Sequence, residues 1–281
     1  MSIKSLVQII AIAVLAVSCG HSGDPGRLTQ SGHSNDELKL KGDKTVYGLA
    51  CEGCTDSVVV LLPNDGSDPV RYDIIEATQQ RQIMGKIKVG DWIGVVLNPQ
   101  DRHKADLVID LDELKGIWCY IVMPKMREYA TMSPRLQKRM MQAMPDSLKQ
   151  LYMIPREYGF WMKRHWTAQS VGYVPEASSL EDESPVVYPQ LSFFTEWHIL
   201  NGQLVMTSGQ VRMKGGNGNY EVTNLRYDTC KIEYLQDDSL VLSSDGIMRS
   251  YYRKANINDV NRKAKAIAAK LSQEALKQAK E

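Results

Sequence analysis

The sequence of 281 residues predicts an all-β protein made of a small barrel followed by a larger antiparallel β-barrel. Three observations support this fold class. Short runs of β-branched and aromatic residues recur between Asn, Asp and Gly turn signals over most of residues 44–253. Residues 133–152 have helical spacing instead and interrupt the second series of strands. Residues 256–281 also have helical spacing, so we expect a helix at the C-terminal end.

The N-terminal residues 1–18 have the three ordered parts of a secretory signal peptide. Lys4 supplies a positive charge, Leu6 to Val17 is apolar apart from one glutamine, and small residues precede Cys19. The apolar run is about a dozen residues, which is too short to span a bilayer. The segment that ends at Cys19 resembles the lipobox of bacterial lipoproteins, which implies that Cys19 is acylated and anchors the mature chain. The alternative is an ordinary cleaved signal peptide in which Cys19 has no role.

Residues 19–40 are rich in Gly, Ser, His and Asp and are expected to form a lipidated, flexible tether. Loss of Lys4 with the signal peptide leaves equal numbers of basic and acidic residues. A neutral chain has no general attraction to nucleic acid, so no nucleic-acid partner is expected. Membrane attachment therefore depends on the acyl chains of Cys19. The expected location is the bacterial cell envelope, with the anchor in the outer membrane and the protein facing the periplasm or the cell surface.

Residues 41–111 are expected to form the small barrel. The patterns predict strands at 45–47, 57–62, 70–75, 83–89, 92–97 and 105–111, with Asn64-Asp65-Gly66 as a turn. So many short strands in so few residues favour a small antiparallel barrel or roll. The block Lys88–Val96 forms a predicted strand, turn and strand, and it resembles the same part of OB-like barrels.

The helical segments are predicted from their caps and spacing. Ser133 is a typical N-cap, Pro134 suits the first helical position, and Pro145 ends the helix. Three apolar residues of this helix are four apart: Leu136, Met140 and Met144. Eight of the thirteen methionines lie between positions 123 and 162, which predicts adaptable packing, a pliant lid over a barrel mouth or a Cu(I) site. The C-terminal helix has a thin, alanine-rich apolar face, so we expect it to dock only partly.

Residues 112–255 are expected to form the larger barrel, with the helical insertion inside it. Gly116 and Trp118 form a G-x-W motif at the start of a predicted strand, and Arg253 ends the last strand. This combination resembles the lipocalin family and the lipocalin-like domains of Gram-negative lipoproteins of unassigned function. In that family the arginine packs over the tryptophan, so the resemblance implies a structural plug that closes the barrel base. The helical insertion departs from the family pattern.

Cys51 and Cys54 form a C-x-x-C pair at a predicted turn. Such a pair predicts a local disulfide, a redox centre or half of a metal site, and we favour the disulfide because neither a βαβ pattern nor a second metal-binding pair accompanies it. Cys119 and Cys230 leave further pairings open. The phrase around Cys51 also resembles the C-x-x-C of NlpE-type envelope lipoproteins, although in that family the motif belongs to the lipocalin-like barrel.

No constellation in the sequence predicts catalysis, so we expect a protein that is not an enzyme and has no cofactor or metal site. His165, Glu196 and His198 are the sole candidates for acid–base chemistry within the larger barrel. The first functional hypothesis is a binding module that holds a lipid or another apolar small molecule in the larger barrel. The alternative is an envelope protein that binds a protein partner or senses stress or metal, with both barrels filled by side chains.

Overall fold

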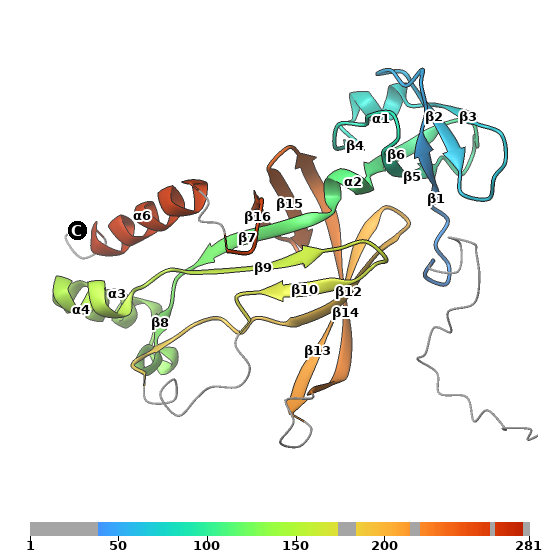
Figure 1. Ribbon diagram of the computed structural model, residues 1–281. Coiled ribbons are helices and arrows are strands. Elements are labelled where there is room, and N and C mark those ends of the chain that lie inside the picture. Colours follow the sequence, from blue (N-terminus) through green and yellow to red (C-terminus); the bar gives the residue numbers. More distant parts are fainter. Residues whose placement is uncertain (1–38, 174–183, 214–219, 259–261, 278–281) are drawn as a thin grey trace, which may run out of the picture. The chain divides into compact units, whose positions relative to one another are not determined.

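A computed structural model describes residues 39–173, 184–213, 220–258 and 262–277 of the chain (Figure 1). The predicted signal peptide, the acylation site Cys19 and nearly all of the predicted tether lie outside these residues. A six-stranded sheet and an eight-stranded sheet account for most of the regular secondary structure of the described residues, which confirms the all-β prediction. No helix in the described part combines the length and the apolar character needed to cross a bilayer.

The small barrel has the strand order β3-β2-β1-β5-β6-β4. Its strands are β1 (Val46–Ala50), β2 (Val58–Pro63), β3 (Val70–Asp73), β4 (Ile83–Met84), β5 (Trp92–Leu97) and β6 (Ala105–Asp110). A parallel bridge between Asp73 and Lys104 brings β3 to the start of β6 and partly closes the sheet. Apart from the two-residue strand β4, the other five strands form a partly open barrel with the OB-like topology that the sequence predicts. Its core contains Val59, Leu61, Ile93, Val95 and Val108, all fully buried.

Two elements of the small barrel differ from the prediction. The strand expected over 70–75 ends at Asp73, and the short helix α1 (Ile75–Gln79) follows it. The Asp73 carboxylate accepts a hydrogen bond from the Ile75 amide at 2.9 Å, which turns the chain out of the sheet. The strand expected over 83–89 is reduced to β4, because Gly85 adopts a positive φ of 97° directly after it.

The larger barrel has the strand order β10-β9-β7-β16-β15-β14-β13-β12, and every neighbouring pair is antiparallel. Its strands are β7 (Gly116–Val122), β9 (Arg156–Met162), β10 (Ala168–Val171), β12 (Phe193–Leu200), β13 (Gln203–Met213), β14 (Tyr220–Gln236), β15 (Ser239–Ser244) and β16 (Ile247–Lys254). The edge strands β10 and β12 meet at a Thr167–Glu196 bridge. The Ser170 hydroxyl adds two bonds there, donating to Ser192 O at 2.8 Å and accepting from Phe194 N at 2.7 Å. The barrel is therefore nearly closed.

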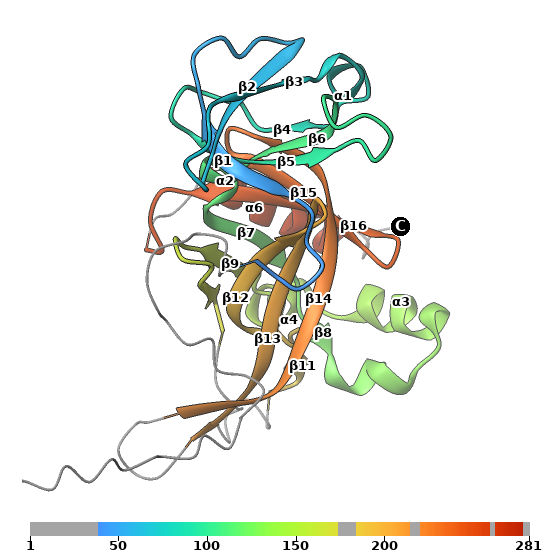
Figure 2. The same ribbon diagram turned by 90° about the vertical axis from the view of Figure 1, so that its right-hand side faces the viewer.

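The hairpin of β13 and β14 is longer than the sequence predicts. The alternation of side chains in the sequence predicts strands at 203–208 and 231–235 only, but the two strands stay paired out to Met213 and Tyr220. The additional residues of β14 mix polar and apolar side chains and none of those described is fully buried, so they lack the alternation that burial of one sheet face produces. Figure 2 shows this hairpin extending past the other barrel strands.

The helical insertion lies between β7 and β9, as predicted. It contains β8 (Lys125–Met126), the 3-10 helix η2 (Arg127–Thr131), α3 (Pro134–Ala143) and α4 (Asp146–Tyr152), and β8 pairs with β11 (Val186–Val187). The Ser133 side chain accepts a hydrogen bond from Leu136 N and caps α3. The predicted C-terminal helix is present as α6 (Arg262–Lys277), and it contacts α4 and β7.

Candidate functional site

One end of the larger barrel, which we call the base, is closed by Gly116, Trp118 and Arg253. Trp118 is fully buried and donates its indole N–H to Leu114 O at 2.8 Å. The Arg253 guanidinium carbon lies 4.2 Å from the centroid of the Trp118 ring. Its nitrogens donate to Lys115 O and Asp237 O at 2.8 Å each and to Glu113 O. The cation is therefore satisfied by carbonyl oxygens and by the ring face, which is the geometry of a structural plug.

Gly116 permits this arrangement because a side chain at this position would crowd the Arg253 guanidinium and strain the backbone. Its φ is +136°, and a Cβ would lie 2.6 Å from the Arg253 Nη1 atom. The structure thus brings the three residues of the G-x-W-and-arginine pattern together at the base, where none of them faces an open cavity that could hold an apolar ligand.

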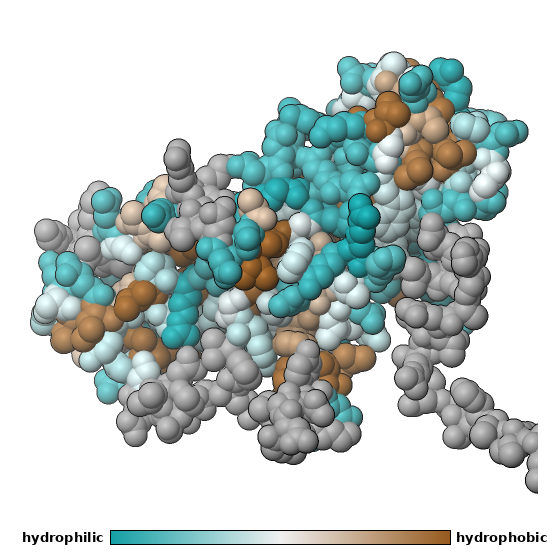
Figure 3. All heavy atoms as spheres, in the orientation of Figure 1, coloured by the Kyte–Doolittle hydropathy of each residue, from teal (hydrophilic) through white to brown (hydrophobic). Residues whose placement is uncertain are grey.

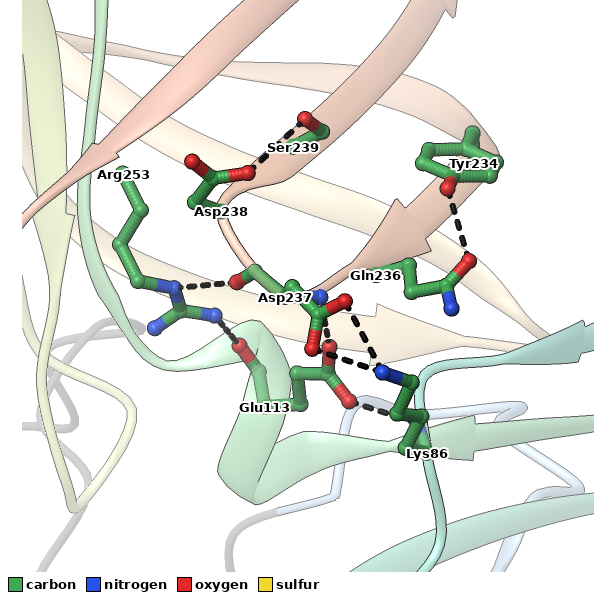
Figure 4. A network of polar contacts seen from close by, with 8 residues as sticks. All are labelled: Lys86, Glu113, Tyr234, Gln236, Asp237, Asp238, Ser239 and Arg253. Carbon is green, nitrogen blue, oxygen red and sulfur yellow. Dashed lines mark hydrogen bonds and ion pairs between the residues drawn. The ribbon is translucent and has the colours of Figure 1, made fainter.

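A polar network beside the plug joins the two barrels (Figure 4). The Glu113 carboxylate of helix α2 (Leu111–Leu114) accepts the backbone N–H groups of Lys86 and Asp237. The Lys86 ammonium lies 2.9 Å from the Asp237 carboxylate. Lys86 belongs to the small barrel and Asp237 to the β14–β15 turn, so this network fixes the two barrels to each other through α2.

The same junction contains a polar cavity of about 380 Å³. It is lined by charged residues: Lys86, Lys88, Asp91, Asp110, Asp112, Glu113, Asp237 and Arg253. Burial raises the pKa of Asp110 to about 7, the bond from Glu113 N opposes this, and the nearby Asp91 and Glu113 charges add to it. A cavity with this lining is unsuited to an apolar ligand. Among the described residues, no group of His, Cys, Asp and Glu is arranged to hold a metal ion.

Aromatic residues gather toward the other end of the larger barrel, its mouth. We call this set the mouth cluster: Tyr120, Tyr158, Phe160, Phe194 and Tyr251. Ring centroids of neighbouring members are 5.1 to 6.4 Å apart, mostly edge to face. Tyr120, Phe194 and Tyr251 are only partly buried. The partly buried rings leave some aromatic surface accessible, and the tyrosines add hydroxyl groups, a combination that suits an apolar or amphipathic small molecule.

Arg249 is the charged member of the mouth. Its guanidinium carbon lies 4.5 Å from the Tyr120 ring centroid, and Nη1 donates to the Tyr120 hydroxyl at 3.3 Å. Burial raises the pKa of Tyr120, and the Arg249 charge lowers it. Burial likewise raises the pKa of Tyr251 to about 12, so both hydroxyls are protonated donors at neutral pH.

Sequence reasoning missed the mouth cluster and Arg249. A usable signal existed, because side chains alternate along a strand. Tyr120 lies two residues after Trp118, and Tyr251 lies two residues before Arg253, so both share the inward face of the plug residues. Extending the alternation from the plug along β7, β9 and β16 would have found them.

The predicted disulfide residues lie at the turn between β1 and β2. Cys51 and Cys54 are partly buried free thiols. The Cys54 Sγ atom lies 3.2 Å from Cys51 O and 3.3 Å from Val60 N. The two cysteines are thus brought close, and their pairing stays a prediction. Cys119 and Cys230 are also free thiols, and burial raises the pKa of each.

The three residues considered for acid–base chemistry are not assembled into a catalytic group. His198 Nε2 and Glu196 Oε2 are 3.5 Å apart, and the bond from His198 lowers the pKa of Glu196. His165 is exposed at the β9–β10 turn with a positive φ of 56°. The next residue, Trp166, is also left-handed and buried, and its ring contacts Trp92, Trp197 and His198. The turn therefore serves the packing between the barrels.

The strand order and the near closure of the larger barrel define an all-β protein with a lipocalin-like barrel. No family model matches the sequence, and no curated protein matches it. Comparison with solved structures finds a lipocalin-like protein from Bacteroides thetaiotaomicron VPI-5482. That protein is 18% identical over 50% of this chain and 94% of its own length, with a TM-score of 0.26. The class rests here on strand order and closure, and the likeness adds nothing about ligand or activity.

Proposed function

We propose that this chain is a membrane-anchored lipoprotein of the bacterial cell envelope that is not an enzyme and binds a lipid or another apolar small molecule. The mouth cluster carries the proposal. Its five rings come from strands β7, β9, β12 and β16 and meet at the mouth, and three of them stay partly exposed. The base is filled by Trp118 and Arg253, so the ligand binds from the mouth and does not reach the plug.

The ligand proposal is tested with delipidated protein and the neutral fluorescent probe N-phenyl-1-naphthylamine. We expect saturable fluorescence enhancement and, by native mass spectrometry, an apolar ligand retained on the protein before delipidation. Tyr120→Ser removes a ring from the mouth cluster and is expected to weaken probe binding about tenfold, since burying an aromatic ring contributes about 1–3 kcal/mol. Tyr227→Ser, at a tyrosine of β14 that is 65% exposed, is the matched control. No retained ligand and equal probe binding by both variants would overturn the proposal.

The anchor is tested separately. Cys19 acylation adds a diacylglyceryl group and an N-acyl chain, and two or more chains hold a protein stably on a membrane. Intact-mass analysis of protein from its own membrane is expected to show a chain that begins at Cys19 and carries that added mass. A chain that begins elsewhere, or an unmodified Cys19 thiol, would refute the anchor and leave the ligand proposal standing.

A second candidate function is binding of an envelope protein, including a role in sensing stress or metal. The specific observation in its favour is a group of exposed apolar side chains on the hairpins of β14 and β16: Leu225, Tyr227, Ile247 and Met248, each 52% to 68% exposed. Crosslinking in intact cells from a photoreactive residue at position 248 tests it. A specific crosslinked partner that disappears with Leu225→Ser would favour this function over ligand binding.

A further inference from the structure

Helix α3 of the insertion has no buried residue along its ten residues, although it is amphipathic. Leu136 and Met140 are 41% and 39% exposed, and they lie one turn apart on the same face. In a helix of a soluble protein such a face normally packs against the core. Here α3 projects away from the barrel strands (Figure 2), tied at its start by the Gln137 side chain, which donates to Tyr129 O and Met132 O.

Further exposed apolar side chains lie on α4 and the chain that follows it. Leu148, Leu151 and Ile154 are 41%, 59% and 54% exposed. Figure 3 shows brown side chains gathered over this part of the molecule, with teal side chains around them. Together with Leu136 and Met140 these residues form what we call the arm face.

Exposed basic residues flank the arm face. Arg135 directly precedes Leu136, and Arg139 directly precedes Met140. The two arginines lie one helical turn apart, so they form a basic stripe beside the arm face. Lys138 is exposed on the same helix, and none of the ion pairs among the described residues involves these three cations. Residues 125–154 contain six basic and two acidic residues, in a chain whose formal net charge is only +1. The positive charge is thus concentrated where the apolar side chains are exposed.

Apolar side chains beside unpaired basic ones are the pattern of a helix that lies in the interface of an anionic bilayer. We propose that the arm face docks on the surface of an anionic membrane, with Leu136, Met140, Leu148 and Leu151 in the acyl boundary and Arg135, Lys138 and Arg139 against phosphate groups. The insertion leaves the barrel from the paired residues Val122 and Arg156 at the mouth end. Docking therefore holds the mouth toward the bilayer. This inference stands on its own and needs neither Cys19 acylation nor a ligand in the barrel.

Hydrogen–deuterium exchange of the full chain on vesicles tests the docking. Vesicles of phosphatidylcholine with 30% phosphatidylglycerol are compared with vesicles of phosphatidylcholine alone. We expect amides of 134–154 to exchange about tenfold more slowly on the anionic vesicles, because each nearby Lys or Arg strengthens binding about fivefold. Amides of the β13–β14 hairpin are expected to exchange equally on both. An acyl anchor is the same in both samples and does not affect the comparison.

Two sets of variants separate charge from apolar contact. Replacing Arg135, Lys138 and Arg139 together by Gln is expected to weaken docking about 100-fold and remove the protection, whereas Lys265→Gln with Lys270→Gln on α6 leaves it unchanged. Leu151→Asp is expected to abolish protection, and Met248→Asp, at a residue that is 66% exposed on β16, is not.

Two outcomes would overturn the proposal. Equal exchange of 134–154 on the two vesicle compositions would show that anionic lipid is not the partner. Protection that rises with protein concentration on phosphatidylcholine alone would show that a second copy of the chain covers the arm face.

Discussion

The base and the mouth of the larger barrel are built from the same strands but differ in how their side chains are satisfied. The base contains four fully buried side chains: Trp118, Trp197, Leu204 and Leu240. The Arg253 cation there is held by carbonyl oxygens and by the Trp118 ring. At the mouth three of the five rings are partly exposed, Arg249 is exposed, and the attached helix α3 has no buried residue. The difference indicates that the base stabilises the fold, and it is the reason why the proposed ligand site is placed at the mouth.

The largest effect is expected at the centre of the base. Trp118→Ala removes a fully buried indole that also donates a hydrogen bond to Leu114 O. The free energy of unfolding is expected to fall by about 3–5 kcal/mol. Trp161→Ala is the control, because this half-buried ring lies on the outer face of β9 and packs against the buried cluster around Ile117, so its loss should cost clearly less. Urea unfolding measures both, and equal losses would contradict the assignment of the base as the core.

A second test of the base addresses the close approach of Gly116 and Arg253. Gly116→Ala places a Cβ 2.6 Å from Arg253 Nη1 in a left-handed backbone conformation. The expected loss of stability is about 1–3 kcal/mol. Gly246→Ala is matched to it, because Gly246 also has a positive φ but no atom lies within 4 Å of its added Cβ. If thermal unfolding shows the same loss for both variants, the contact with Arg253 contributes nothing.

The junction beside the base adds a dependence on pH. Burial raises the pKa of Asp110 to about 7, whereas an unfolded Asp has a pKa near 3.9. The folded chain therefore holds this proton at pH values where the unfolded chain has released it. The carboxyl destabilises the fold progressively as the pH rises from about 4 to 7, and fully above 7.

Asp110→Asn removes the charge and keeps an oxygen for the bond from Glu113 N, which is 2.9 Å long. We expect the variant to be more stable than the parent by about 1–3 kcal/mol at pH 8 and equal to it at pH 4. Urea unfolding at the two pH values checks this, with the exposed Asp68→Asn as control. A difference that does not change with pH would rule out a raised pKa for Asp110.

Much of the fold could be predicted from local patterns. The Ser133-Pro134 start of α3, the hairpin turns and the alternation in the central strands are short-range signals, and the structure confirms the all-β class, the helical insertion and the C-terminal helix. The outer half of β14 could not be predicted, because none of its described residues is fully buried and pairing with β13 holds it in the sheet. Pairing of that kind leaves no pattern in a single strand.

The candidate site was harder to predict, for a physical reason. The G-x-W motif with Arg253 is visible because the plug needs one glycine, one ring and one cation in fixed places. The mouth cluster needs only rings of about the right size on one face, and tyrosines such as Tyr120 and Tyr158 are equally common in filled cores. The left-handed conformation of Trp166 is also invisible in the sequence, because it depends on packing against the small barrel.

The smallest effect on stability is expected at the mouth. Arg249→Gln removes an exposed cation from the Tyr120 ring, which should cost less than about 1 kcal/mol. Burial raises the pKa of Tyr120, and the Arg249 charge partly offsets this rise. Removing the charge is therefore expected to raise the pKa of Tyr120 further. NMR titration of tyrosine labelled with ¹³C at Cζ measures the pKa, with the exposed Arg212→Gln as control. A loss of stability as large as that of Trp118→Ala would make the mouth a second structural core, because a ligand site that is free to open cannot also carry the stability of the barrel.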